Sequence, residues 1–287
     1  MNGSLLNSPA KKGGIYFSCL IVAVIAAALA VSSIKPAGDI NFAYLASPVA
    51  ILLVSLAFLY LNEGEVKPTL GLALPKRRFS LYALLALAAM FFGLSGLNDY
   101  FIAFLKTFGY KPSVVELPPL TPLNALYVGF AVCLLPAVFE EIAFRGIMVN
   151  SLGGADRLWV SLLLGALFSL YHLNPAQTLY QFAVGFIFTL LAVTSQSVLP
   201  AMVLHFINNL LIVVLYYAAG EYALPLPVNI VLTVFGVACT VALIVLLLKE
   251  KQEKTDNKGI GEFALYAVFG IFICVAVWVG ALYRPFA

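Results

Sequence analysis

Long apolar runs fill this chain, and their length constrains its fold more than any other feature. Hydrophobic residues make up 63% of the 287 positions and charged residues only 10%, whereas an average soluble domain has about 25% charged residues. About 20 apolar residues in a helix span the hydrocarbon core of a bilayer, where the backbone must satisfy its hydrogen bonds internally. The composition therefore predicts an integral multi-pass membrane protein made of helices.

Nine of these runs are long enough to be candidate membrane spans, although the fifth is short and the sixth and seventh are joined almost without a loop. Segment 99–110 is amphipathic, which is typical of a helix at the membrane interface, and the prolines of 111–121 predict an irregular connector. We predict an all-α polytopic transmembrane bundle with about eight or nine spanning helices and no soluble domain. The candidate spans are 15–33, 41–61, 80–98, 122–147, 157–173, 177–196, 198–218, 226–248 and 262–282.

The basic residues of the loops orient the chain. With nine spans and an inside N-terminus, eleven Lys and Arg residues fall on the inside and four on the outside, while Arg145 lies within a span. This bias predicts a cytoplasmic N-terminus and an outside C-terminus. The basic residues gather in a few loops rather than in a patch, so no nucleic-acid partner is expected.

Polar side chains interrupt three of the apolar runs. Ionisable groups in lipid-spanning helices are unfavourable, so a sequence that keeps them there usually uses them. Both histidines of the chain belong to this set, which packing alone does not explain. The set consists of Glu140, Glu141 and Arg145 in the fourth run, His172 at the end of the fifth, and His205 and Asn209 in the seventh.

Helical geometry separates the two glutamates. Glu141 and Arg145 are four residues apart, so they lie about 40° apart on the helix and can form an ion pair. Glu140 lies about 140° from Arg145, and a buried carboxylate without a counter-ion accepts a proton more readily, as a general base for water must. Pro136 removes a backbone hydrogen bond one turn earlier and predicts a kink that opens room beside Glu140. The alternative is a helix end whose Glu and Arg side chains are simply solvated.

The two histidines differ in their surroundings. His205 and Asn209 share one face of their helix and together offer two donors for a developing oxyanion. The alternative for this pair is an interhelical hydrogen bond that holds the bundle together. His172 shares its face with Phe168, and by itself it is typical of a helix-end histidine bonded to a backbone carbonyl.

Three motifs, EExxxR, FxxxH and HxxxN, occur in this order on successive runs. The chain thereby resembles the CPBP family (CAAX protease and bacteriocin-processing, also called Abi) of intramembrane endopeptidases, whose best-known branch is the Rce1-like CAAX prenyl proteases. The resemblance covers about residues 122–218. The motifs consist of Glu140, Glu141 and Arg145, of Phe168 and His172, and of His205 and Asn209.

The resemblance implies a role for each motif. Glu140, with His172, would activate the attacking water, and His205 and Asn209 would stabilise the tetrahedral oxyanion. Glu141 and Arg145 would orient the site, with Phe168 in support. The implied substrate is a peptide, or a prenylated CAAX protein that loses its last three residues, and no cofactor is implied. Many relatives are prokaryotic, so the expected location is a prokaryotic cell membrane.

Two other readings stay open at this point. Glu140, His172 and His205 are a legitimate set of ligands for a catalytic zinc, although the chain has no HExxH helix and its four cysteines are isolated. The protein could also be a non-enzymatic immunity or transport-type membrane protein, because intramembrane Glu and His also serve as proton or ion sites. Transporters often contain internal repeats, and this sequence shows none.

The motifs divide the chain into three parts. Residues 1–121 are expected to form three spans and an interfacial connector, 122–218 a catalytic core, and 219–287 the C-terminal spans. Depth is a difficulty for this arrangement. Glu140 and His205 lie about 10 Å from the inside boundary, whereas His172 lies about 22 Å from it at 1.5 Å per residue. The fifth helix must therefore start later or tilt, or the site must extend over some depth.

Overall fold

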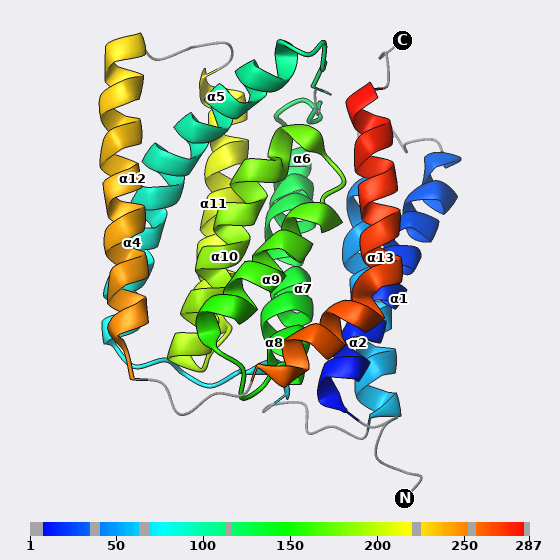
Figure 1. Ribbon diagram of the computed structural model, residues 1–287. Helices are drawn as coiled ribbons and strands as arrows, with labels where there is room; N and C mark the ends of the chain where they lie inside the picture. Colours follow the sequence, from blue (N-terminus) through cyan, green and yellow to red (C-terminus); the bar gives the residue numbers. More distant parts are fainter. Residues whose placement is uncertain are drawn as a thin grey trace, which may run out of the picture.

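The computed structural model describes residues 8–34, 41–62, 69–112, 116–219, 225–251 and 257–283, and these residues contain helices and connecting segments but no strand. Some helices follow one another without a break, and three short π-helical segments lie within such stretches (Figure 1). In chain order the elements are α1 (Pro9–Ser32), α2 (Ala43–Leu61), α4 (Arg78–Ala88), η1 (Ala89–Leu94), α5 (Ser95–Lys106), α6 (Pro122–Val128), η2 (Gly129–Leu134), α7 (Leu135–Glu141), η3 (Ile142–Met148), α8 (Val149–Ser151), α9 (Arg157–Tyr171), η4 (Pro175–Gln177), α10 (Thr178–Ser195), α11 (Leu199–Ala219), α12 (Leu226–Lys249) and α13 (Lys258–Tyr283).

The predicted fold class is confirmed. Eight helical stretches of the described chain are long and apolar enough to cross a membrane. The fifth run forms α9, which has 15 residues and is shorter than the roughly 20 residues that a span requires. The start of α1 and the end of α13 lie at opposite ends of the bundle (Figure 1).

The third span is longer than the sequence predicted. α4, η1 and α5 form one helical stretch of 29 residues, Arg78–Lys106, so the residues after 98 do not form a separate interfacial helix. The physical reason is packing against protein. Asn98 in α5 donates to the carbonyl of Ala176 at 3.0 Å and accepts from the backbone N–H of Tyr180 at 3.3 Å. These bonds hold α5 against η4 and α10.

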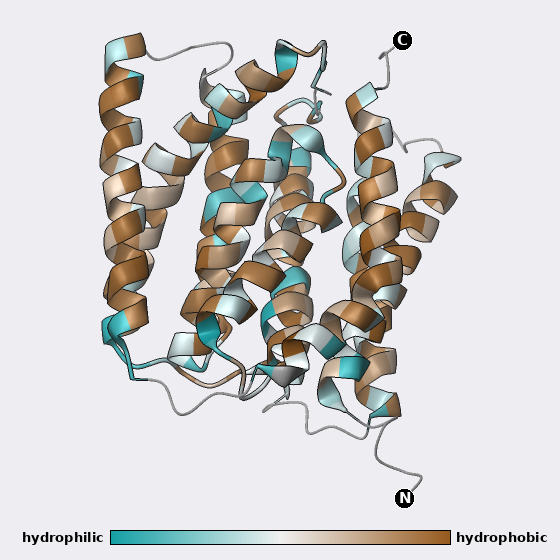
Figure 2. Ribbon diagram, in the orientation of Figure 1, coloured by the Kyte–Doolittle hydropathy of each residue, from teal (hydrophilic) through white to brown (hydrophobic). Residues whose placement is uncertain are grey.

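The bundle has a central group of helices with a smaller group on each side. α7, α9, α10 and α11 lie in the middle, α4 and α12 on one side, and α1, α2 and α13 on the other (Figure 1). Hydrophobic residues cover most of the helix length, and hydrophilic residues gather mainly toward the two ends (Figure 2).

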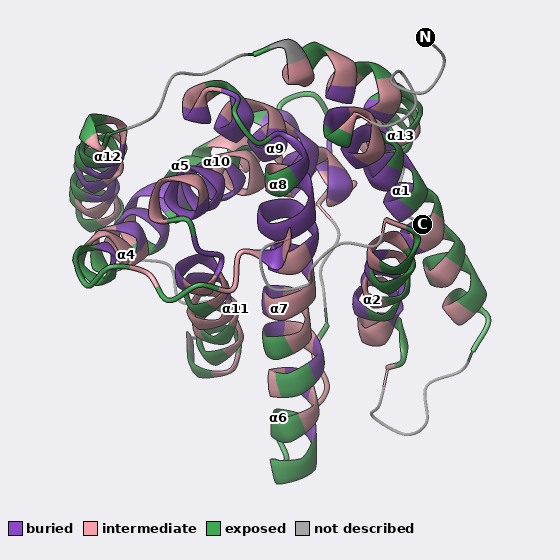
Figure 3. Cartoon of the chain, turned by 90° about the horizontal axis from the view of Figure 1, so that it is seen from below, coloured by how far each residue is buried: buried purple, intermediate pink, exposed green. Residues whose placement is uncertain are grey.

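Large apolar side chains point outward from the helices. Leu84, Val231 and Phe272 have 63%, 67% and 70% of their surface exposed. Viewed along the bundle, exposed residues line the outer faces of α2, α11, α12 and α13 (Figure 3). Apolar side chains at such positions suit a lipid environment, because lipid tails are as apolar as Leu.

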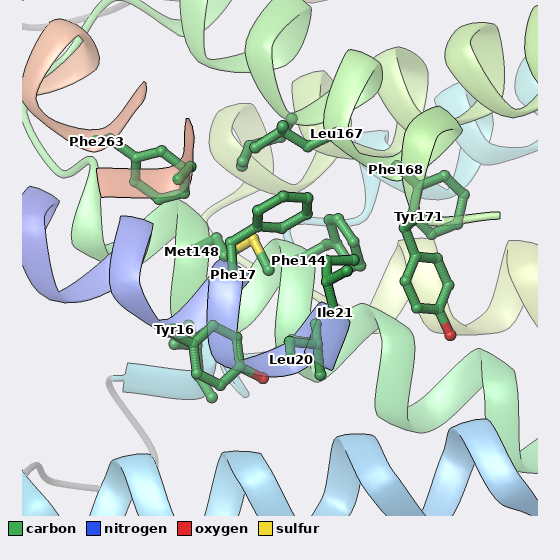
Figure 4. Close-up of a cluster of buried hydrophobic side chains, with 14 of the residues drawn as sticks. Tyr16, Phe17, Leu20, Ile21, Phe144, Met148, Leu167, Phe168, Tyr171 and Phe263 are labelled. Carbon is green, nitrogen blue, oxygen red and sulfur yellow. The ribbon is translucent and has the colours of Figure 1, made fainter. Parts of the chain in front are cut away.

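Aromatic rings from α1, η3, α9 and α13 pack together in the interior of the bundle. Phe17 in α1, Phe144 in η3, Phe168 in α9 and Phe263 in α13 are all fully buried, and they meet in one cluster with Tyr171 (Figure 4). The ring centroid of Phe144 is 5.0 Å from that of Phe168 and 5.5 Å from that of Tyr171, in edge-to-face geometry. Such pairs prefer this geometry, and here they fix α9 against the helix that carries the two glutamates.

Glycines allow the closest helix crossings. A Cβ atom on Gly236 of α12 would lie 2.0 Å from the backbone nitrogen of Gly93 in η1. Without Cβ atoms the two backbones come into direct contact, which is a common way for helices to pack in membranes. The crossing therefore depends on glycine at both positions.

Gly236→Ala is expected to destabilise the protein by about 1–3 kcal/mol, because the added methyl group forces the two backbones apart. The measurement is thermal unfolding of the purified protein in detergent. Gly280→Ala is the matched control, since a Cβ atom on Gly280 of α13 meets open space. Equal melting temperatures for the two variants would contradict this account of the crossing.

Candidate active site

The helix that carries the two glutamates contains two π-helical segments. η2 (Gly129–Leu134) ends just before Pro136, and η3 (Ile142–Met148) starts just after Glu141. A wide π-helical turn before Pro136 accommodates a residue that cannot donate a backbone hydrogen bond. π-segments are rare and occur frequently at functional sites.

Glu141 is the central acceptor of the site. Its Oε1 accepts one hydrogen bond from Arg145 Nη1 at 2.9 Å and one from His205 Nδ1 at 2.8 Å. The Arg145 bond is the ion pair expected from their spacing of four residues, and both side chains have no exposed surface. The His205 bond joins α7 to α11, and no spacing in the sequence predicted it.

Arg145 extends these contacts to two further helices. Its Nη2 donates to the carbonyl of Gly185 in α10 at 3.1 Å. Its guanidinium carbon lies 4.3 Å from the ring centre of Phe168 in α9 and 5.5 Å from that of Phe188 in α10. A guanidinium over an aromatic face gains cation–π stabilisation, which is larger when the pair is desolvated. Arg145 therefore links η3, α9 and α10 at one point.

Glu140 has a different environment from Glu141, as the helical wheel predicted. Its Oε1 accepts a hydrogen bond from the Tyr171 hydroxyl at 3.2 Å. Its Oε2 lies 4.0 Å from His205 Nε2 and has no hydrogen-bond partner among the residues that the structure describes. Only 7% of Glu140 is exposed. A buried polar atom without a partner in this way is unusual and requires an explanation.

His172 ends α9, and its Nδ1 lies 2.7 Å from the carbonyl oxygen of Phe168. Because a carbonyl can only accept, Nδ1 carries a proton, and in a neutral ring Nε2 is then an acceptor. This is the helix-end contact that His172 alone suggested. The contacts of the described residues include none between His172 and Glu140, so the shared role implied by the resemblance stays a prediction.

The apparent difference in depth between the motifs disappears in the folded chain. The Phe168 ring centre is 4.7 Å from that of His172 and 6.2 Å from that of His205. The ring therefore lies close to both histidines, and Tyr171 at the end of α9 reaches Glu140. Since α9 is short and packs inside the bundle, its end lies level with the glutamates.

Asn209 lies one helical turn beyond His205 and donates from Nδ2 to the carbonyl of Val132 in η2 at 3.2 Å. The amide group has two hydrogens, and this bond uses one of them. The neighbouring Asn208 accepts instead from the hydroxyl of Tyr180. Asn208 also donates from Nδ2 to Asn209 Oδ1 at 3.4 Å, so the two side-chain amides are linked.

Three residues at the site were missed in the sequence. Tyr171 contacts Glu140, Ser47 in α2 contacts the Tyr171 hydroxyl, and the ring centre of Phe188 lies 6.0 Å from that of His205. Tyr171 directly precedes His172, and that adjacency was a usable signal. Ser47 and Phe188 lie in ordinary apolar runs and gave none.

The side chains proposed as zinc ligands do not fit that role. Within the described parts of the chain, no three His, Cys, Asp or Glu residues form a group that could hold a metal ion. The four cysteines are free thiols at separate places. We derive no chemistry through a metal at this site.

The comparison with known families agrees with the motifs. Residues 122–211 match the model of the family described as type II CAAX prenyl endopeptidase Rce1-like. This match confirms the predicted resemblance, and the matched segment contains Glu140, His172, His205 and Asn209. No curated protein and no solved structure matches the chain.

Arg145→Met is expected to destabilise the protein by about 3–5 kcal/mol, because it leaves the buried Glu141 carboxylate without its counter-ion. Thermal or denaturant unfolding in detergent measures the change. Arg78→Met is the control, since Arg78 pairs with Glu250 at 2.7 Å but is half exposed, and such pairs contribute at most about 1 kcal/mol. A loss as small for Arg145→Met as for Arg78→Met would contradict the central role of this ion pair.

Proposed function

Starting from the Rce1-like segment, we propose that this protein is an intramembrane endopeptidase that cleaves a peptide bond with a water molecule activated by Glu140. The family match supports the assignment as a protease. One observation supports the role of Glu140 as the base that activates the water. The Oε2 atom of Glu140 is buried, lacks a hydrogen-bond partner among the described residues and faces His205 Nε2 at 4.0 Å.

A separation of 4.0 Å between Glu140 Oε2 and His205 Nε2 suits one bridging water. Hydrogen bonds of about 2.8 Å to each atom allow this span with a bent bridge. Glu140 would take a proton from that water as it attacks the carbonyl carbon, since a carboxylate held in reach of the water serves as a general base.

His205 and Asn209 are suited to stabilise the oxyanion. As an oxyanion donor, His205 would carry a hydrogen on both ring nitrogens. Its Nδ1–H bonds to Glu141, and its Nε2–H would then point at the reacting centre. The second amide hydrogen of Asn209 would add another donor, and such donors contribute most in a water-excluded site.

Glu141, Arg145 and Phe168 would hold this arrangement without touching the substrate. Glu141 fixes the His205 ring through Nδ1, and Arg145 fixes Glu141. The Phe168 ring covers the guanidinium. A third group that orients a catalytic histidine recurs in unrelated hydrolases. His172 would supply a further acceptor through its Nε2 atom.

We propose a prenylated CAAX protein as the substrate, cleaved on the side of the membrane that faces the cytoplasm. The support is the matched family, which is described as type II CAAX prenyl endopeptidase Rce1-like. The bias of the basic loops supports a cytoplasmic N-terminus, and the N-terminal end of α1 lies at the end of the bundle that also contains α8 (Figure 1).

Glu140→Gln is expected to lower the rate of peptide cleavage by about 10²–10⁴-fold, because the amide cannot accept the water's proton. Cleavage of a fluorogenic peptide by purified protein measures the rate, and the melting temperature checks folding. Glu116→Gln, which changes an exposed carboxylate at another part of the chain, should keep wild-type activity. Full activity in Glu140→Gln would sink this mechanism.

A farnesylated CAAX peptide is expected to be cleaved at least about tenfold more efficiently than its unprenylated twin, because burial of each CH₂ group contributes about 0.8 kcal/mol. The measurement is kcat/KM for both peptides. Equal values would contradict the substrate class but not the endopeptidase activity.

Metal content and the response to a chelator test the mechanism separately. Zinc in stoichiometric amount, with activity lost to a chelator and restored by zinc, would replace the water mechanism by a metal-dependent one.

A further inference from the structure

We infer that Tyr171 and Ser47 position the Glu140 carboxylate, so that α2 contributes to the active site from outside the matched segment. This inference rests on the proposed function. The Tyr171 hydroxyl donates to Glu140 Oε1 at 3.2 Å and is itself hydrogen-bonded to Ser47 Oγ. Residues 122–211 include Tyr171 and Glu140 but not Ser47.

The direction of these hydrogen bonds follows from the groups involved. An ionised carboxylate only accepts, so the single hydrogen of the phenol goes to Glu140. Tyr171 then has no hydrogen left for Ser47, and the serine hydroxyl must donate to the phenol oxygen. Three oxygens therefore form a chain of fixed order that starts in α2, passes through the end of α9 and ends in α7.

This chain of hydrogen bonds fixes the orientation of the Glu140 carboxylate, which its own side-chain torsion does not. The last torsion of a Glu side chain has a broad energy minimum, so the carboxylate plane is poorly fixed by sterics. A hydrogen bond to Oε1 sets this plane, and the other oxygen, Oε2, is then the one that faces His205. Reacting groups must be held to within a fraction of an ångström, because a 1 Å misplacement lowers the rate by about 10²-fold.

The surroundings of Tyr171 are rigid enough for this role. Only 6% of its surface is exposed, and its ring centre lies 5.5 Å from that of Phe144 and 6.3 Å from that of Phe168. The hydroxyl points away from this aromatic cluster (Figure 4). Packing thus fixes the ring, and the two hydrogen bonds fix the hydroxyl.

α2 also takes part in a second Tyr–Ser hydrogen bond, which has no contact with Glu140. The Tyr16 hydroxyl of α1 is hydrogen-bonded to Ser55 Oγ at 2.7 Å, and both residues are buried. Ser55 lies eight residues after Ser47 in α2, which brings it near the same face of the helix. Loss of either Tyr–Ser bond should affect folding alike, but only Tyr171 reaches Glu140.

The experiment compares Tyr171→Phe with Tyr16→Phe in the full-length protein in detergent. Tyr171→Phe is expected to lower kcat for peptide cleavage by about 10–100-fold while KM stays within about twofold, because the reacting groups lose alignment rather than binding. Ser47→Ala is expected to lower kcat less. The double variant should be no slower than Tyr171→Phe, because Ser47 acts through Tyr171 and their effects are not additive.

The matched controls Tyr16→Phe and Ser55→Ala should keep wild-type kcat. Unchanged kcat in a folded Tyr171→Phe protein would overturn the inference, as would an equal loss in Tyr16→Phe or additive effects of the Ser47 and Tyr171 changes. If Glu140→Gln abolishes cleavage while Tyr171→Phe is fully active, only this inference fails.

A second measurement detects the hydrogen bond between Tyr171 and Glu140 without relying on activity. The infrared carboxyl band of Glu140 is identified by its loss in Glu140→Gln. It should shift in Tyr171→Phe and stay in place in Tyr16→Phe, because only the first change removes a donor from the carboxylate. A band unmoved in Tyr171→Phe overturns the inference even in a protein that cleaves nothing.

Discussion

The site depends on one oxygen atom, Glu141 Oε1, which accepts hydrogen bonds from Arg145 and His205 at once. Buried charges are strongly destabilising without partners, so this atom holds α7, η3 and α11 in one relative position. Arg145 passes the constraint on to α10 through Gly185 and to α9 through the Phe168 ring. Glu140 directly precedes Glu141 on the same helix, and its Oε2 atom therefore also lies near the His205 ring, 4.0 Å from Nε2.

The close packing of α9 against α10 brings the end of α9 to the glutamates. A Cβ atom on Gly185 of α10 would lie 3.0 Å from Gly165 Cα and 3.0 Å from Phe168 Cβ in α9. The two glycines therefore allow a close approach of the helices, and the same glycine offers its carbonyl to Arg145. The short α9 can thus end inside the bundle, where its last residues reach the glutamate.

Local features of the site could be predicted from the sequence, and features that join distant segments could not. The pairing of Glu141 with Arg145 and the separation of Glu140 from it follow from the turn of a helix. The bonds from His205 to Glu141 and from Tyr171 to Glu140 join residues 64 and 31 positions apart, and no periodicity reports such a distance. The continuation of the third span past residue 98 to Lys106 was not predicted for a related reason, because the contacts of Asn98 with Ala176 and Tyr180 lie far along the chain.

The sequence by itself determined the all-helical membrane architecture, because the length of an apolar run is set by the bilayer and can be counted along the chain. It also predicted the resemblance of residues 122–211 to the Rce1-like family, because the motif residues lie three or four positions apart and can be read along the chain. Only the tertiary structure decided that Glu140 Oε2 faces His205 Nε2, that Ser47 of α2 contacts the Tyr171 hydroxyl, and that His172 comes level with His205. Each of these depends on how helices cross, and helix crossing is set by contacts between side chains that the linear order does not contain.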